Sequence, residues 1–475
     1  LRPGPGAYPR RPDPPPAHRR PAGEGTMSPR GGSPDPVAEA AARMGRELCR
    51  TAVWDAERRM CNWVGRSDVE DPAGGLATAT IALYAPLAGG SAGVALFLGE
   101  LAARTGDAAA GATAAGALRR SVHHLRVREN PSQALSFFTG TLGVAFAGRR
   151  LAELGILEED EVDVPWLLGR AEDALVAEHP LDWMGGDAGA IPALLWLAGR
   201  TGMETRCLTL ARSCGDRLRR EATWEDDRCG WDAARATGHS MQCPPLTGFS
   251  HGASGMALAL LELHARTGDP ELLRTARGAL AYEDAWFSAR GGNWADLRFP
   301  HSRDGDEVTG TLQGAWCHGA PGIGLARARA ALLDPEQGNA HARMARIALD
   351  TTVELVRARR ATPRADATLC HGMGGLSEIL LIAAGLLDEP RYADEARATA
   401  LALAERHGPA GDWPCGTTTG EPNPAFLIGV PGIGHHFLRV ASPGTVEPVL
   451  LVRAGDGPAA RKPGRRAGSR LARMG

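Results

Sequence analysis

Cysteine and histidine stand directly before a glycine at three places in this chain, and side chains of these types bind metal ions. The three segments read Ser250-His251-Gly252, Cys317-His318-Gly319 and Cys370-His371-Gly372. Thiolate and imidazole are ligands that zinc prefers in proteins. The chain contains no CxxC or HxxxH pattern that would build a site locally. Metal binding therefore requires a fold that brings the three segments together.

Each segment opens one copy of a repeat, in which a Gly-x-x-Gly turn is followed by an apolar run. The second glycines of successive copies are 50, 46, 66, 67, 53 and 57 residues apart. A repeat of this length indicates supersecondary units that stack or close on one another. The seven copies are Gly90 to Gly93, Gly140 to Gly143, Gly186 to Gly189, Gly252 to Gly255, Gly319 to Gly322, Gly372 to Gly375 and Gly429 to Gly432.

The apolar runs after the turns have helical spacing, and a second helical pattern follows several of them, as after Pro270 and Pro390. This predicts an all-α fold, an α/α toroid of about seven helical hairpins with inner and outer rings of helices. Glycine permits close backbone approach and positive φ where a loop turns into a helix. Since every inner helix begins with the same turn, we expect all the turns at one end of the ring, around a common pocket.

The composition divides the chain into three parts. Residues 1–36 are rich in Pro and Arg and predict a disordered segment, in which Met27 is a candidate start; 37–453 hold the toroid; 454–475 predict a basic disordered tail. Two long connections, 221–250 and 289–316, directly precede turns that carry cysteine or histidine before their first glycine, which we call decorated turns. We expect these connections to form walls or lids over the pocket.

Charge and cysteine usage limit the classes of partner. The net charge is −2 and the repeats carry no basic stripe, which argues against a nucleic-acid partner. Nine cysteines, without regular pairing, do not suggest a disulfide scaffold. The chain has no apolar stretch of 18 residues, so we expect no membrane insertion. A cytoplasmic protein with reduced thiols is the resulting prediction.

The decorated turns predict a zinc site built on the two cysteines. Two Cys and two His would close a tetrahedral structural site, whereas two Cys and one His leave one position open for a substrate. Seven mutually packed hairpins do not need a metal ion to fold. This favours the open, catalytic form.

Three other patterns fail on their context. Gly248–Gly252 matches the G-x-S-x-G motif of serine hydrolases, but Pro244 and Pro245 precede it where a strand is required. Gly319–Gly324 has the glycine content of a dinucleotide loop without a surrounding βαβ unit. The acidic run 158–163 is typical of a solvated loop.

Four segments of the chain resemble the lanthionine synthetase C-like proteins, the cyclases of lanthipeptide biosynthesis. They are GFSHGASG, WCHGAPGIGLAR, LCHGMGG and FLIGVPGIGHHFLRV, and the resemblance covers about residues 40–452. The WCHG form and the ending GTVEPVLLVR are more similar to the cyclase half of bifunctional class II synthetases. The large dehydratase region of those synthetases is absent here, so we expect either a free-standing cyclase with a separate dehydratase or a fragment.

The resemblance implies a function, a cofactor and roles for particular residues. It implies a zinc-dependent cyclase, with one zinc per chain, that adds cysteine thiolates of a dehydrated precursor peptide to dehydroalanine or dehydrobutyrine, forming (methyl)lanthionine thioethers. By motif match, the resemblance implies three zinc ligands, Cys317, Cys370 and His371. It also implies that His251 is the catalytic histidine and Asp182 its acidic neighbour. His318 stands beside the ligand Cys317, where it would hold an enolate or replace an aromatic residue of other members. Asp187 is a competing carboxylate in the turn of Asp182.

Three other functions remain open at this point. One is a relative that adds glutathione to dehydroamino acids. Another is a non-catalytic peptide-binding module of a modification complex, against which the full set of Cys and His argues. The third is a sugar-processing toroid, whose site would need paired carboxylates at its mouth.

Overall fold

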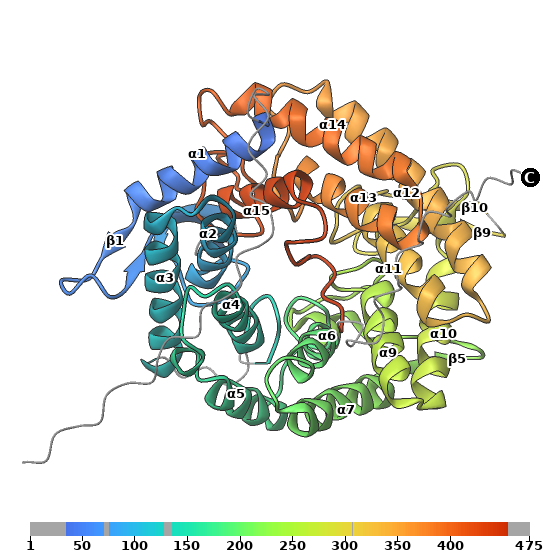
Figure 1. The fold of residues 1–475 in the computed structure, drawn as a ribbon. Coiled ribbons are helices and arrows are strands. Elements are labelled where there is room, and N and C mark those ends of the chain that lie inside the picture. The colour runs from blue at the N-terminus through green and yellow to red at the C-terminus, as the bar shows by residue number, and fades with distance from the viewer. Residues whose placement is uncertain (1–34, 71–75, 128–134, 306, 455–475) are drawn as a thin grey trace, which may run out of the picture. The chain divides into compact units, whose positions relative to one another are not determined.

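Two concentric rings of helices form the body of the protein (Figure 1). The computed structural model describes residues 35–70, 76–127, 135–305 and 307–454, and the chain from Asp35 on forms one compact unit. The predicted disordered segment, up to residue 34, and the predicted tail, from 455, lie outside the described residues. The predicted α/α toroid is confirmed.

The inner ring consists of helices that begin at the seven Gly-x-x-Gly turns. They are α2 (Ser91–Thr105), α4 (Thr141–Glu153), α6 (Asp187–Ala198), α9 (Ala253–Thr267), α11 (Ala320–Leu333), α13 (Met373–Leu387) and α15 (Val430–Ala441). The first glycine of each turn is the N-cap residue of its helix. All twelve residues of α6 are buried. A helix that is apolar on every side is typical of a position enclosed by other helices.

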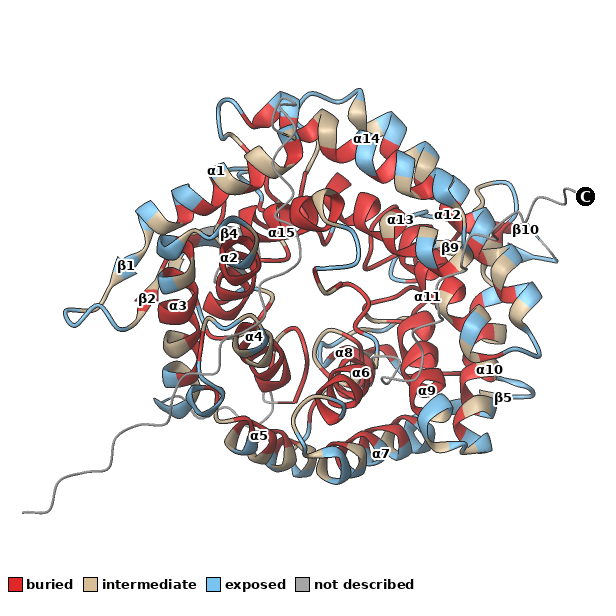
Figure 2. Cartoon of the chain, in the orientation of Figure 1, coloured by how far each residue is buried: buried red, intermediate tan, exposed pale blue. Residues whose placement is uncertain are grey.

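The outer ring covers the inner one. Its helices are α1 (Pro36–Thr51), α3 (Ala108–Val127), α5 (Val164–Val176), α7 (Glu204–Glu221), α10 (Pro270–Asp284), α12 (Gly338–Arg360) and α14 (Pro390–His407). These helices bury one face and expose the other (Figure 2). Each outer helix packs on the inner helix that precedes it in the chain, except α1, which packs on α15 and so closes the ring. No helix in the described part of the chain is long and apolar enough to cross a membrane.

Sequence signals at the helix starts explain several of these boundaries. Helices α1, α5 and α10 each begin with an aspartate followed within two residues by proline. The carboxylates of Asp35, Asp163 and Asp269 accept a backbone N–H of the first turn. Proline fits there because its missing N–H would have no partner in the helix.

The glycines at the turns are required by close backbone approach. A Cβ on Gly322 would lie 2.1 Å from the carbonyl oxygen of Trp316, and one on Gly375 would lie 1.9 Å from that of Leu369. The predicted close approach is therefore confirmed. The predicted positive φ is wrong for six of the seven first glycines, all of which are described; only Gly319, at 88°, has it. At five of the other six, Gly90, Gly186, Gly252, Gly372 and Gly429, a Cβ would lie 2.1–2.4 Å from a backbone atom, so steric crowding rather than left-handed backbone selects glycine there.

We number the turns 1 to 7 in chain order; among the described residues, backbone hydrogen bonds join five of the seven pairs of neighbouring turns. Two successive N–H groups of one turn donate to a single carbonyl of the next. These pairs are Trp183 and Met184 to Ser250, Phe249 and Ser250 to Cys317, Leu369 and Cys370 to Leu427, and Phe426 and Leu427 to Ala88. Ala88 in turn 1 also donates to Phe138 in turn 2. The turns thus lie together at one end of the ring, as predicted.

The strands form small antiparallel pairs outside the rings. They are β1 (Val53–Trp54) with β2 (Cys61–Asn62), β3 (Val64–Glu70) with β4 (Leu76–Ala82), β5 (Thr223–Glu225) with β6 (Arg228–Gly230), β7 (Phe287–Ser288) with β8 (Asn293–Trp294), and β9 (His301–Asp304) with β10 (Glu307–Gly310). A short helix, α8 (Ala233–Thr237), follows β6. Most of these strands lie in the connections that run from an outer helix to the next turn.

The hairpins after α1 and α7 are structural copies of each other. In each, a tryptophan packs on a glycine of an outer helix, a thiol donates to a threonine carbonyl, and a second indole donates to a leucine carbonyl. The corresponding contacts are Trp54–Gly116 and Trp224–Gly278, Cys61–Thr113 and Cys229–Thr275, and Trp63–Leu48 and Trp231–Leu218. Burial raises the pKa of Cys61 and of Cys229 to about 12. These two thiols therefore have a packing role.

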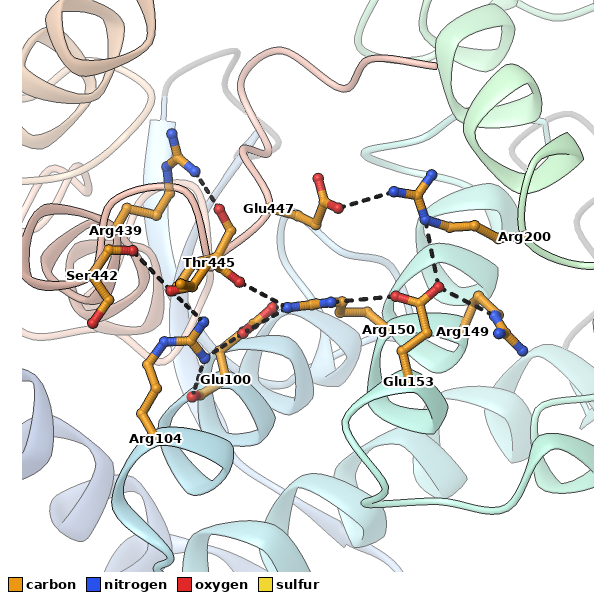
Figure 3. Close-up of polar contacts among 11 residues, drawn as sticks. Glu100, Arg104, Arg149, Arg150, Glu153, Arg200, Arg439, Ser442, Thr445 and Glu447 are labelled. Carbon is orange, nitrogen blue, oxygen red and sulfur yellow. Dashed lines mark hydrogen bonds and ion pairs between the residues drawn. The ribbon is translucent and has the colours of Figure 1, made fainter. Parts of the chain in front are cut away.

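The segment after α15 closes the end of the ring opposite the turns. Figure 1 shows it running from α15 into the middle of the ring, and Val449, Leu450 and Leu451 are buried there. Ion pairs and hydrogen bonds at the C-terminal ends of α2, α4 and α6 hold it (Figure 3). They include Arg150 to the Thr445 carbonyl at 3.0 Å, Arg200 to Glu447 at 3.1 Å, and the buried Glu100 to Arg104 and Arg150, each at 2.6 Å. The turn end is left as the accessible end.

Candidate functional site

Cys317 and Cys370 meet because they occupy equivalent positions in neighbouring turns, 5 and 6. Each stands five residues before the second glycine of its turn. The sulfur atoms of Cys317 and Cys370 and a ring nitrogen of His371 all lie within 4.8 Å of one another. The two thiols are nearly buried, at 7% and 8% exposure, whereas His371 is exposed. This cluster could hold a metal ion that remains accessible from solvent.

The cluster favours a thiolate. The hydrogen bond from the Cys370 thiol, supported by His371, holds the pKa of Cys317 well below its usual range, although burial opposes this. The same contact raises the pKa of Cys370, and the hydrogen bond to Cys317 raises that of His371. A deprotonated thiol beside an imidazole is what a metal ion requires of such ligands.

The junction between turns 5 and 6 differs from its neighbours. Among the described residues, no backbone hydrogen bond joins these two turns. Arg359, near the end of α12, spans them instead, donating to the carbonyl of His371 at 2.9 Å and to that of Gly314 at 2.7 Å. Burial lowers the pKa of Arg359, and Asp366 opposes this effect. Arg359 is a positioning residue that the sequence gave no reason to select.

His251 is paired with Asp182 across two turns. Its Nδ1 lies 2.6 Å from Oδ2 of Asp182, which is 1% exposed. The other carboxylate oxygen accepts the Gly185 N–H at 2.6 Å, so Asp182 also holds the turn that precedes α6. With Nδ1 engaged, Nε2 is the nitrogen of His251 left for a substrate, and 29% of this side chain is exposed. His251 is not part of the cysteine–histidine cluster.

Asp187 is directed away from His251. Its Oδ2 lies 3.1 Å from Nε2 of His179 and 3.8 Å from Nε of Arg217; the carboxylate and the imidazole are fully buried, and the arginine is partly exposed. This is a structural ion-pair cluster between α6 and α7. The geometry therefore associates Asp182, and not Asp187, with the catalytic candidate.

His318 lies close both to Cys317 of the cluster and to His251. Its ring centroid is 5.5 Å from that of His251, and the rings are inclined by 31°. Burial lowers the pKa of His318 to about 4, with Arg298 and His251 acting in the same direction and Cys317 opposing them. Its neutral imidazole can donate or accept one hydrogen bond at the site. Three histidines, 251, 318 and 371, thus occupy the same position of turns 4, 5 and 6.

The amino-acid sequence of the repeat region matches one known family. The model described as Lanthionine synthetase C-like protein matches residues 85–451. The chain belongs to this family. Its fold is similar to that of nisin cyclase, with a TM-score of 0.57 and 17% identity over 75% of this chain and 89% of that one.

Two carbohydrate-active proteins show weaker structural similarity. They are a sugar epimerase from a ruminal bacterium, with a TM-score of 0.39 and 11% identity over 86% of this chain and 98% of that one, and the unsaturated glucuronyl hydrolase from Bacillus sp. GL1, with 0.37 and 16% over 85% and 94%.

The two long connections have different roles in this member of the family. In the first, α8 fixes the turn that carries Asp182, because the Ala236 carbonyl accepts the N–H of Asp182 at 3.1 Å, and the β5–β6 hairpin packs on α10. The expectation of a lid is wrong for that hairpin. The second connection brings Asp296 and Arg298, paired at 2.6 Å, beside His318. That this connection forms a wall over a pocket stays a prediction, and its sequence gave no signal for these two residues.

Glu283 on α10 fixes the turn of His251 from outside. Its carboxylate accepts the N–H of Gly248 at 2.9 Å and the hydroxyl of Ser254 at 2.5 Å. Burial raises the pKa of Glu283, while Arg327 opposes the shift. Ser250, the centre of the G-x-S-x-G match, is fully buried, and its hydroxyl points to the Cys317 carbonyl at 3.5 Å. This arrangement does not provide a serine nucleophile.

Proposed function

We propose that the protein is a zinc-dependent lanthipeptide cyclase, which forms thioethers between cysteine and dehydroamino acids of one peptide. The cluster of Cys317, Cys370 and His371 carries the proposal, together with family membership. A tetrahedral zinc ion with ordinary Zn–S and Zn–N bonds needs sulfur and nitrogen ligands about 3.5 Å apart. The Cys370 sulfur and the His371 Nε2 are 3.5 Å apart. The donor set therefore fits zinc and leaves a fourth position free.

Zinc in this position would stabilise the thiolate of a substrate cysteine, which is the nucleophile in thioether formation. His251 stands beside the cluster with Nε2 available, and Asp182 holds Nδ1 protonated. We infer that Nε2 takes the proton of the substrate thiol. When sulfur bonds to the β-carbon of the dehydroamino acid, the π electrons move to the α-carbon and its carbonyl, forming an enolate. The proton on Nε2 then goes to the α-carbon, and His251 is restored.

His318 limits the space at the site and offers one hydrogen bond to the enolate oxygen. The partners of the reaction in this proposal are a dehydrated precursor peptide and a separate dehydratase that prepares it. The pair of Asp296 and Arg298 supports the orientation of the His318 ring. These assignments give each of the three histidines of turns 4 to 6 a separate role.

The test uses a peptide with one dehydroalanine and one cysteine, with cyclisation followed by loss of the alkylatable thiol. His251→Ala should keep stoichiometric zinc, measured by elemental mass spectrometry, and lose cyclisation. Loss of zinc in this variant would make His251 a ligand and contradict its assigned role. A parallel reaction with a cysteine-free dehydrated peptide and glutathione checks the alternative thiol donor, because that product is heavier by one glutathione.

A further inference from the structure

A groove outside the ring has no role in the proposed chemistry. It lies between the β1–β2 hairpin, the end of β4 and the C-terminal half of α3, and its volume is about 770 Å³. Pockets that take small ligands or short chain segments have volumes of roughly 300–1,000 Å³. A space of this size receives a few residues of an extended chain rather than the face of a folded partner.

Apolar side chains are unusually exposed around this groove. Val53, Tyr84 and Val127 line it and are 62%, 55% and 61% exposed. They are three of the nine large apolar side chains that are exposed in the described part of the chain. Apolar groups gathered at a concave surface mark a binding site more often than isolated ones do.

Arg120 places a cation in the same groove, where the carboxylate of Asp55 already accepts the backbone N–H groups of Arg59 and Met60. Its Nη1 is inaccessible to solvent and has no hydrogen-bond partner among the described residues. His123 and His124 line the groove on the same helix. A buried arginine nitrogen without a partner is costly, so Arg120 gains stability by turning its guanidinium toward a partner in the groove that it lines. A carboxylate is the group whose charge and geometry suit a guanidinium best.

The copied hairpin indicates that Arg120 is not needed for folding. Arg120 follows Thr113 by seven residues, as Tyr282 follows Thr275 in the copy. There, the Tyr282 hydroxyl donates to the Pro245 carbonyl at 2.7 Å, seven residues before the first glycine of turn 4. The corresponding carbonyl before turn 1 is that of Leu83, and it receives the side-chain amide of Asn62 at 3.0 Å. In the hairpin after α1, Asn62 therefore makes the contact to this carbonyl that Tyr282 makes in the copy.

The groove opens at the end of the ring where the site lies. The carbonyl of Tyr84 accepts the N–H of Ser91 at 2.9 Å, the first residue of α2 after turn 1. Turn 1 is joined to turn 7, and turn 7 to turn 6, which carries Cys370 and His371. A chain held in the groove can therefore continue over these turns toward the cysteine–histidine cluster.

We propose that this groove docks an extended segment of the precursor peptide in which apolar and acidic side chains alternate. Its apolar side chains pack on Val53, Tyr84 and Val127, and one carboxylate pairs with Arg120. The identity of the partner rests on the proposed function. The docked segment is a part of the peptide other than the ring being closed, so the groove holds the substrate while its cysteines reach the cluster.

The binding test uses the full chain and a fluorescein-labelled Glu-Val-Glu-Leu-Glu-Val peptide, with fluorescence anisotropy as the readout. We expect binding that weakens with salt, and at least about tenfold weaker binding of the corresponding lysine peptide. Arg120→Glu should weaken binding of the acidic peptide by about tenfold or more. Arg120→Tyr, which installs the residue of the copied hairpin and so should fold, must do the same. Arg212→Glu, a charge reversal at an exposed position of α7, is the matched control and should bind normally.

Activity separates this inference from the proposed function. Arg120→Glu should cyclise a short neutral peptide at the wild-type rate, and should raise KM without lowering kcat for the same peptide with an acidic extension. If wild-type protein binds the acidic peptide through Arg120 but cyclises neither substrate, the docking site stands and the proposed function fails. Equal binding by wild type and both Arg120 variants would overturn the docking proposal. So would a dimer that Arg120→Glu dissociates without any effect of peptide, since the groove would then join two copies of the chain.

Discussion

Asp182→Asn changes one atom of the His251–Asp182 pair and tests whether this pair moves a proton. In the native protein the carboxylate accepts Nδ1–H at 2.6 Å, which leaves Nε2 free to accept a proton. An asparagine amide would donate to Nδ1 and place the ring proton on Nε2. The contact to the Gly185 N–H at 2.6 Å uses the other oxygen and can remain. The substitution should therefore reverse the tautomer of His251 while keeping the turn in place.

The size of the effect follows from the contribution of a positioned acid or base, about 10²- to 10⁴-fold in rate. Asp182→Asn should lower kcat/KM for cyclisation by this factor, equivalent to about 2.7–5.4 kcal/mol in activation free energy. Zinc content should not change, because Asp182 is not part of the metal cluster. The assay combines elemental mass spectrometry with the rate of thiol loss from a dehydrated peptide.

Asp187→Asn is the matched control, since it removes a buried carboxylate from the same turn region. Asp187 contacts His179 and lies close to Arg217, so its loss should lower the free energy of unfolding by about 1–3 kcal/mol. The rate per folded molecule should stay at the wild-type value. The reasoning is refuted if Asp182→Asn keeps its rate within threefold, or if Asp187→Asn loses as much activity while folded and zinc-loaded.

Four further predictions concern the metal site and stability. Cys317→Ala and Cys370→Ala should each abolish zinc binding, measured by elemental mass spectrometry, whereas the control Cys61→Ala should keep zinc. Stoichiometric zinc in either of the first two variants would show that the substituted cysteine is not a ligand. Arg359→Ala should weaken zinc binding by about 10- to 100-fold in a chelator competition, since residues that orient metal ligands have effects of this size. The control is Arg357→Ala, whose partner Glu395 lies on α14, and this variant should bind zinc with unchanged affinity. Cys61 and Cys229 have folded-state pKa values of about 12, above those of unfolded thiols. Their contribution to stability is therefore complete below about pH 8.5 and is lost as pH rises toward 12, by up to about 1.4 kcal/mol per pH unit and thiol. Chemical denaturation from about pH 8 to 10 should show this slope, and the slope should be smaller in the Cys61→Ala Cys229→Ala double variant. Glu100→Gln should leave Arg104 and Arg150 with weaker partners and lower the midpoint of thermal unfolding, while the exposed Glu159→Gln, also at an arginine, should change it little.

The sequence alone was sufficient for the repeat and the inner ring. Seven glycine pairs and the apolar runs after them are local signals, because glycine is the residue that fits against a carbonyl 1.9–2.2 Å from its missing Cβ. The equivalence of the turns also selected Cys317, Cys370, His371 and His251 as residues that converge. Periodicity sufficed here, since in a closed ring of equal units equivalent positions must be neighbours.

The sequence did not reveal the contacts that depend on other elements. Arg359 lies on an outer helix that has the ordinary polar pattern of a surface helix, and nothing in α12 signals its reach to two turns. The hairpins after α1 and α7 share a Trp followed by Cys-x-Trp, but spacings between Trp and Cys that differ by two residues obscured the repeat. In both cases the partner is far away in the chain, and its identity depends on ring closure.

The division between the two sources of information is clearest at the two aspartates. The resemblance of the sequence to the family implied that Asp182 stands close to His251, with Asp187 as a competing carboxylate in the same turn. Only the tertiary structure decided between them, since the contact of Asp182 with His251 spans 69 residues and that of Asp187 with His179 spans eight. Local sequence fixes where a helix begins and which residues cap it. Which direction each buried carboxylate faces depends on the packing of α6 against α7 and α9.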